Sequence, residues 1–160
     1  MSCVLGIDPG LDGAFVLTDG EQVICRHMPL KVGGKHKEVD FDAVRELLGN
    51  PNITHIFLER AMALAMGSSH AFNYGRNFGF LEIAIKLSGL PVTYVLPKEW
   101  MKIMHEGISD DLKPKAKSLV ALERLFPKLK DQLPKKPKGG MHDGFVDALL
   151  IAGYGLRKIK

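Results

Sequence analysis

The dipeptide Asp19-Gly20, set between two runs of apolar residues, constrains the fold of this chain more than any other feature of the sequence. Asp-Gly flanked by alternating apolar residues is the strongest short-range signal for a β-hairpin. Residues 13–18 and 22–28 are therefore expected to form two antiparallel strands. A short apolar strand over residues 3–7 precedes them, so the sequence predicts a meander of three strands.

The rest of the chain alternates between predicted strands and predicted helices. Further strands are expected over residues 55–59 and 92–96. A Pro-, Lys- and Gly-rich loop is expected over residues 127–140. Helices are expected over 41–48 with Asp40 as N-cap, over 69–87, from Pro97 onward, over 115–126 and over 143–158. A meander followed by strands joined through helices predicts an α/β fold, with a mixed five-stranded sheet flanked by helices.

The composition is that of an ordinary globular chain. With 160 residues, 46% hydrophobic and 25% charged, the length suits one domain spanning residues 1–160 and excludes a disordered tail or a disulfide scaffold. Cys3 and Cys25 lie in apolar stretches and are expected to be buried thiols in a reducing compartment. No run of 18 apolar residues occurs, and residues 1–10 lack a basic leader, so a cytoplasmic location without membrane contact is expected.

Positive charge is concentrated in one segment. Residues 113–138 contain nine Lys and Arg against two acidic residues, whereas the remainder has 13 basic and 16 acidic residues. Such a segment suits a polyanion such as nucleic acid, although a solvated Lys-rich helix and loop would have the same composition. A second basic loop, residues 31–37, could track phosphates or serve as a solvated connection.

Two carboxylates end predicted apolar strands. Asp8 follows residues 3–7, where it could also form a turn with the Pro-Gly that comes next. Glu59 ends the strand over 55–59, where Glu has a poor strand propensity. Its alternative role is a surface ion pair with Arg60.

Two more carboxylates lie in the last predicted helix. Asp147 is surrounded by the apolar residues of segment 145–151, where a charge is costly unless it is paired or bound to a cation. Asp143 precedes it by four residues and shares its helical face, although Asp143 could also be the N-cap. His142 is either a loop residue facing solvent or an additional metal or phosphate contact.

Four carboxylates brought together would repel and raise one another's pKa values. Two divalent cations would neutralise them, and Mg²⁺ prefers oxygen ligands completed by substrate phosphate. Two such ions about 4 Å apart activate water and stabilise the leaving oxygen of a phosphodiester. With the basic segment, the carboxylates predict a metal-dependent nuclease.

Four stretches of the chain resemble the RuvC-like Holliday junction resolvases, most of all the phage and organellar branch. They are GIDPG (6–10) before the hairpin, FLE (57–59), HD (142–143) and DAL (147–149), and the likeness extends to VLPKEW (95–100). The resemblance implies an RNase H-like fold, a homodimer, and paired symmetric nicks in a four-way DNA junction. It also implies a location in the host cytoplasm for a phage protein, or in an organelle.

Carried over residue by residue, the resemblance makes Asp8, Glu59 and Asp147 catalytic metal ligands, with Asp143 as the fourth acid. The cofactor would be two Mg²⁺ ions per site, with Mn²⁺ as a possible substitute. Many bacterial members place the penultimate acid or His three residues before the last Asp, where this chain has Gly144. The departure leaves open whether Asp143 or His142 completes the second metal site.

The resemblance also suggests residues that contact DNA. A lysine near the scissile phosphate would be Lys115 or Lys117, and Lys98 is a further candidate. Met62, with Leu64 and Met66, falls in a loop expected to face the junction, where apolar side chains could wedge between bases or pack in a helix. Trp100 is expected in the core, and the remaining aromatic residues are expected in the core or in a dimer interface: Phe72, Tyr74, Phe78 and Phe80.

Three other functions compete with this hypothesis. A ribonuclease H acting on RNA–DNA hybrids shares the carboxylate chemistry, and a non-catalytic nucleic-acid-binding module would explain the basic segment. That module would leave Asp147 without a cation. An actin-like phosphotransferase also has an Asp-x-Gly turn after its first strand, but it needs two such domains and 160 residues are too few.

Overall fold

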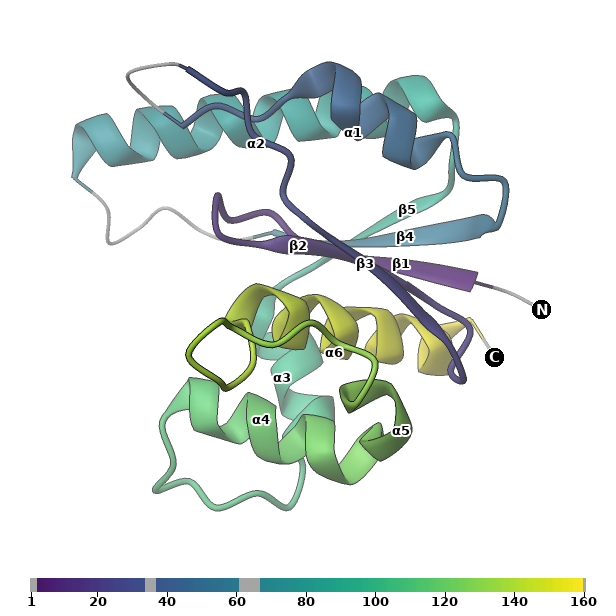
Figure 1. Cartoon of the computed structure of the whole chain (residues 1–160), viewed down its shortest axis with the longest axis vertical. Coiled ribbons are helices and arrows are strands. Elements are labelled where there is room, and N and C mark those ends of the chain that lie inside the picture. The colour runs from purple at the N-terminus through teal and green to yellow at the C-terminus, as the bar shows by residue number, and fades with distance from the viewer. Residues whose placement is uncertain (1–2, 34–36, 61–66, 160) are drawn as a thin grey trace.

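The computed structural model describes residues 3–33, 37–60 and 67–159, in which one five-stranded sheet lies between two sets of helices (Figure 1). The strands are β1 (Cys3–Asp8), β2 (Ala14–Thr18), β3 (Val23–His27), β4 (Ile53–Glu59) and β5 (Val92–Val95). The helices are α1 (Phe41–Leu48), α2 (Ser68–Ser88), α3 (Pro97–Met104), α4 (Pro114–Leu125), α5 (Pro127–Lys130) and α6 (Asp143–Lys158). Helices α1 and α2 cover one face of the sheet, and α6 covers the other with α3, α4 and α5 beyond it.

The sheet has the predicted mixed topology, with strand order β3-β2-β1-β4-β5. Strands β1, β2 and β3 form the antiparallel meander, while β1 pairs with β4 and β4 with β5 in parallel. The hairpin at Asp19-Gly20 is confirmed, with residues 19–22 as its connection. Asp19 Oδ1 accepts hydrogen bonds from the backbone N–H groups of Glu21 and Gln22, and Gly20 has a φ of 100°, which favours glycine.

Alternate residues of the central strands fill two separate apolar cores. Leu5 and Ile7 of β1 pack with α1 and α2, whereas Val4 packs in the core that contains α6. Side-chain direction alternates along a strand, so the side chains of Asp8 and Glu59 both lie on the face of the sheet that α6 covers. A one-residue slip of either strand would turn its carboxylate into the apolar core beneath α1 and α2. Burial of the strand residues therefore sets the face on which the acids lie.

Helix α6 lies unusually close to β1 because glycine is present at the points of contact. A Cβ atom on Gly6 would be 2.1 Å from the backbone oxygen of Ala148, and one on Gly155 would be 2.5 Å from the Phe57 ring. Every residue of α6 from Gly144 to Gly155 is buried except Asp147, which is half-buried. This close packing brings the carboxylate of α6 to the end of β1.

Several local predictions need correction. The segment predicted as a loop over 127–140 contains the short helix α5, in which Leu129 is buried. The N-cap of α6 is His142, so the interpretation of Asp143 as N-cap is wrong. Cys3 and Cys25 are free thiols, but they are half-buried because β3 is an edge strand and β1 begins at the sheet margin. Within the described ranges, no helix is both long and apolar enough to cross a bilayer.

Candidate active site

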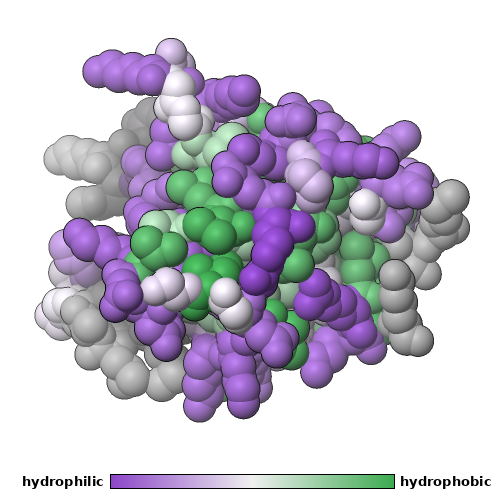
Figure 2. Space-filling model, turned by 90° about the horizontal axis from the view of Figure 1, so that it is seen from below, coloured by the Kyte–Doolittle hydropathy of each residue, from purple (hydrophilic) through white to green (hydrophobic). Residues whose placement is uncertain are grey.

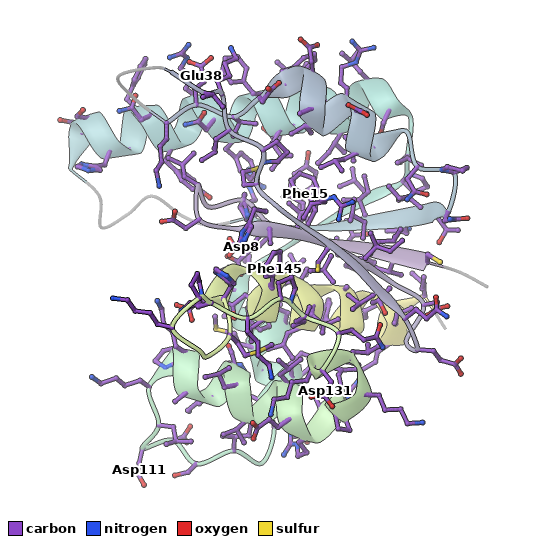
Figure 3. All side chains as sticks on the ribbon, viewed as in Figure 1. Asp8, Phe15, Glu38, Asp111, Asp131 and Phe145 are labelled. Carbon is purple, nitrogen blue, oxygen red and sulfur yellow. The ribbon has the colours of Figure 1, made fainter. Side chains whose placement is uncertain are left out.

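Three carboxylates from distant parts of the chain approach one another at one end of the sheet. Asp8 ends β1, Glu59 ends the adjacent strand β4, and Asp147 lies in the first half of α6. Figure 3 shows Asp8 close to the start of α6, which carries Phe145. Repulsion from Asp8 and Asp147 helps to raise the pKa of Glu59, and repulsion from Asp8 helps to raise the pKa of Asp147. The strand order and the close packing of α6 therefore produce a single negative site.

Asp8 combines a structural contact with a place in this site. Its Oδ1 accepts a hydrogen bond of 3.0 Å from the backbone N–H of Gly10, so it does form the turn proposed as an alternative. Burial nevertheless raises the pKa of the Asp8 carboxyl, opposed by the Gly10 N–H and reinforced by Asp12. The turn thus fixes the side chain without neutralising its charge.

Glu59 is held by a tryptophan. The indole Nε1–H of Trp100, a fully buried residue of α3, donates a hydrogen bond of 2.6 Å to Glu59 Oε2. Burial raises the pKa of Glu59 to about 7, and repulsion from Asp8 and Asp147 adds to the effect of burial. Among the described residues Glu59 has no ion pair with Arg60, so the alternative of a surface pair is wrong.

Asp147 faces α4. Burial raises the pKa of its carboxyl to about 6, with contributions from Asp8 and Asp143, while Ser118 lowers it by hydrogen bonding and Lys115 by its charge. Asp147, Ser118 and Lys115 line one small hollow together with Asp143. The carboxylate is thus reachable from the surface although its helix is buried on all other sides.

Asp143 differs from the other three acids because lysines neutralise it. Lys115 Nζ lies 2.6 Å from Asp143 Oδ2, and Lys136 Nζ lies 3.7 Å from its other oxygen. These contacts lower the pKa of Asp143, with the Lys115 hydrogen bond as the largest cause. The ring of His142 packs against the rings of His27 and Phe145, with centroids 4.8 and 5.5 Å away.

The structure separates the three candidate lysines. Lys115 is highly exposed and lies beside the acids, whereas Lys117 is largely buried and pairs with Asp110 at 2.6 Å. Lys98 is exposed in the first turn of α3, two residues before Trp100. Met62 lies outside the described residues, as do Leu64 and Met66. Of the three lysines, Lys115 is therefore the one that forms an ion pair with a candidate site acid, Asp143.

The carboxylates fit a divalent cation in charge and donor type. They supply only oxygen atoms, which are the ligands that a hard cation prefers. The pKa of each of Asp8, Glu59 and Asp147 is raised, so these carboxyls hold protons that a bound cation could replace. Among the described residues, no three His, Cys, Asp or Glu side chains are already arranged around one point as ligands. The acids are instead turned toward protein donors: the Gly10 N–H, Trp100 and Ser118.

Three residues of the site were missed or undervalued by sequence reasoning. Trp100 is in the core as predicted, but its N–H also holds Glu59. Ser118 contacts Asp147 from a helix whose sequence shows no sign of it. The hydroxyl of Tyr74 on α2 is buried with no hydrogen-bond partner in the described part of the chain. Burial raises its pKa to about 12, with Glu59 and Asp8 adding to the effect. Of the three, only Trp100 gave a signal in the sequence, because the N–H of a buried Trp usually has a hydrogen-bond acceptor.

The other aromatic residues of α2 divide between core and surface. Phe78 packs against the core formed with α1, whereas Phe72 is 71% exposed. Phe80 is half-buried, with Arg76 over its ring at 5.4 Å. The core interpretation is therefore wrong for Phe72.

The mixed sheet, the order of its strands and the helix across its centre define an RNase H-like fold. No protein-family model matches the chain, and no curated protein matches it. Solved structures do. The chain is similar to Thermus thermophilus RuvC in complex with a Holliday junction substrate, with 17% identity, a TM-score of 0.63, and coverage of 99% of this chain and 96% of that one.

Two further structures show the same likeness. A second structure of Thermus thermophilus RuvC has 16% identity and a TM-score of 0.57, over 98% of this chain and 96% of that one. The yeast mitochondrial Holliday junction resolvase Ydc2 has 17% identity and a TM-score of 0.53, over 96% of this chain and 77% of that one. At these identities the likeness establishes the fold, in agreement with the resemblance that the sequence motifs indicated.

Proposed function

We propose that this chain is a metal-dependent endodeoxyribonuclease that resolves four-way DNA junctions. The observation that carries the proposal is the meeting of Asp8, Glu59 and Asp147, each partly buried, and each with a raised pKa. Buried acids that repel one another cost stability, and a cation-dependent reaction explains why they are present. The fold shared with RuvC and Ydc2 supports a four-way junction as the substrate.

In this function Asp8, Glu59 and Asp147 would hold Mg²⁺ or Mn²⁺, and Asp143 would be the fourth acid once Lys115 leaves it for a phosphate. Two bound ions would activate the attacking water and stabilise the 3′ oxygen that leaves. Trp100 and Ser118 hold the ligands in place, and Lys115 would orient the scissile phosphate. The products would be a 5′-phosphate and a 3′-hydroxyl.

The surface beside the site suits a polyanion. On the face seen from below, to which α4 and α5 contribute, hydrophilic side chains surround a central group of hydrophobic ones (Figure 2). Exposed lysines of the basic segment include Lys113, Lys115, Lys128, Lys135, Lys136 and Lys138. A duplex arm that reached the acids would pass close to Lys115 and Lys136, which already bracket Asp143. The protein would act where its DNA lies, in the cytoplasm or in an organelle.

Helix α2 supports the expected homodimer. Phe72, Ile83 and Leu87 are 71%, 52% and 69% exposed. At 100° per residue they lie within about 60° of one another around the helix, opposite the buried side. On the same side Gly75 and Gly79 have open space where a Cβ atom would be, which permits close approach of a second helix. Two copies joined through α2 would supply the two active sites that symmetric nicking requires.

The test compares three substrates in the presence and absence of Mg²⁺: a four-way junction, a linear duplex and an RNA–DNA hybrid. The wild type is expected to nick the junction only with Mg²⁺. Asp8→Asn and Asp147→Asn are expected to bind the junction without nicking it, and Asp131→Asn, at an exposed acid that ends α5, serves as the control. Preferential cleavage of the hybrid would indicate a ribonuclease H. Junction binding without any cleavage would indicate a binding module.

A further inference from the structure

Three side chains beyond the acids form a connected set behind two of them. Ser118 of α4 and Asp147 line the same small hollow, where Ser118 lowers the pKa of Asp147 by hydrogen bonding, and Ser118 Oγ lies 3.2 Å from His105 Nε2. The His105 ring meets Trp100 edge-on, with centroids 5.6 Å apart and planes at 78°. Trp100 in turn donates to Glu59. His105 therefore touches both Ser118 and Trp100.

The position of His105 in the chain suits a role in joining elements. It ends α3, where its backbone N–H bonds to the Met101 oxygen at 2.8 Å, and its ring reaches across to α4. The donor to Glu59 lies on α3 and the donor to Asp147 lies on α4. Neither helix contributes a carboxylate to the site, and besides these two donors α4 supplies Lys115, which pairs with Asp143.

The hydrogen-bond roles in this set follow from counting protons. Ser118 has one hydroxyl hydrogen, and it lowers the pKa of Asp147 in the way that a donated hydrogen bond does. Its oxygen is then the acceptor for His105, so Nε2 of His105 must carry the ring proton. Burial and the charge of Lys117 lower the pKa of His105, which favours the neutral ring with that single N–H.

We propose that His105 is a positioning residue which, through the Ser118 hydroxyl, orients the Asp147 carboxylate for binding a divalent cation. The inference rests on the proposed function, because it concerns the same acids. Without the His105 N–H, the Ser118 hydroxyl is free to turn to a carbonyl of its own helix, as Ser side chains in helices commonly do. Asp147 would then lose the contact that selects its rotamer.

The effect expected is that of losing an outer partner of a metal ligand, which weakens metal affinity by about 10- to 100-fold. Two substitutions of His105 by amides test whether the location of the side-chain N–H matters. In Gln the side-chain N–H lies where Nε2 lies in His, whereas in Asn it lies near the Nδ1 position. His105→Gln is therefore expected to preserve the contact with Ser118, and His105→Asn to break it.

The experiment measures Mn²⁺ binding to the DNA-free protein by electron paramagnetic resonance. Relative to wild type, His105→Asn and Ser118→Ala are each expected to weaken binding about 10-fold or more, and His105→Gln by less than about 3-fold. The double variant His105→Asn/Ser118→Ala is expected to bind no more weakly than Ser118→Ala. In metal-free wild type, ¹⁵N NMR is expected to show His105 protonated at Nε2, and Ser118→Ala is expected to remove that preference.

The outcomes distinguish this inference from the proposed function. If wild type binds Mn²⁺, Asp147→Asn abolishes binding and His105→Asn binds as wild type does, the positioning role is overturned and the nuclease proposal stands. If wild type binds no Mn²⁺, both are overturned. Equal weakening by His105→Gln and His105→Asn would show that the ring matters for packing against Trp100 alone. Should His105→Asn fail to fold, Ser118→Ala and the NMR measurement decide the question.

Discussion

Replacing Glu59 by Gln is expected to stabilise the metal-free protein at pH 8 and to change it little at pH 5. Burial, with repulsion from Asp8 and Asp147, raises the pKa of Glu59 to about 7 from an ordinary value of 4.5. The folded protein therefore binds the Glu59 proton more tightly than the unfolded chain does. The free energy of unfolding of wild type should then fall as the pH rises from about 5 to about 7, and Gln removes the part of this fall that Glu59 contributes.

The size of the effect follows from the two pKa values. A tenfold change in proton affinity corresponds to about 1.4 kcal/mol, so an ionised Glu59 costs the folded state about 3 kcal/mol at pH 8. At pH 5 the cost is less than about 1 kcal/mol, because the folded protein keeps the proton. For a chain of this length each kcal/mol changes Tm by about 2–4 °C, so the variant should melt about 6–12 °C above wild type at pH 8.

The assay is thermal and urea unfolding in EDTA at pH 5 and pH 8, followed by addition of Mg²⁺ at pH 8. Mg²⁺ should raise the Tm of wild type and narrow its difference from Glu59→Gln, because the ion binds the ionised acids of the folded state only. Glu106→Gln, a change at an exposed carboxylate, is the control and should leave the pH dependence unaltered. If wild type and Glu59→Gln show parallel pH profiles, the argument from buried carboxylates is refuted.

Three further predictions test the packing, the DNA surface and the buried hydroxyl. Gly144→Ala should destabilise the protein by about 1–3 kcal/mol or more in urea unfolding, because its Cβ would lie 2.5 Å from a backbone oxygen of the β1–β2 turn. Gly67→Ala, at the N-cap of α2 with open space where the Cβ atom would lie, should change stability little, and equal losses at both glycines would contradict the reasoning. Lys115→Ala should weaken junction binding and reduce its salt slope by about 1, whereas Lys117→Ala should leave the slope unchanged; the reverse result would move the contact to Lys117. Tyr74→Phe should leave Tm unchanged or raise it, because the hydroxyl has no hydrogen-bond partner in the described residues; a clear drop in Tm would reveal a partner.

The structure also explains the departure from the bacterial resolvase pattern at position 144. The pattern has an acid or His there, but in this chain the backbone oxygen of Asp12 and the backbone of Gly13 occupy the space that a side chain would need. Asp143, one residue earlier, has room to reach Lys115 and Lys136. Close packing of α6 on the β1–β2 turn therefore excludes any side chain at the family position.

Local patterns predicted the five strands and every described helix except α5, and they singled out the four acids. The Asp-Gly hairpin, the N-cap at Asp40 and the run of α6 to Lys158 were all predicted, because capping and turn formation depend on neighbours in the chain. Asp147 was conspicuous because its sequence neighbours are apolar. Side chains alternate between the two faces of the sheet along β1 and β4. The sequence was therefore sufficient to predict that Asp8 and Glu59 lie on the same face.

What the tertiary structure alone decided is how each acid is held. Trp100 lies 41 positions from Glu59, and Lys115 lies 28 positions from Asp143, so no local pattern reports either contact. The choice between Lys115 and Lys117 likewise depends on where α4 packs against α6, which directs one lysine to the acids and the other to Asp110. Hydrogen bonds between side chains depend on three-dimensional distance. The sequence determined which groups carry charge, and only the packing of α3, α4 and α6 determined which partner each charge meets.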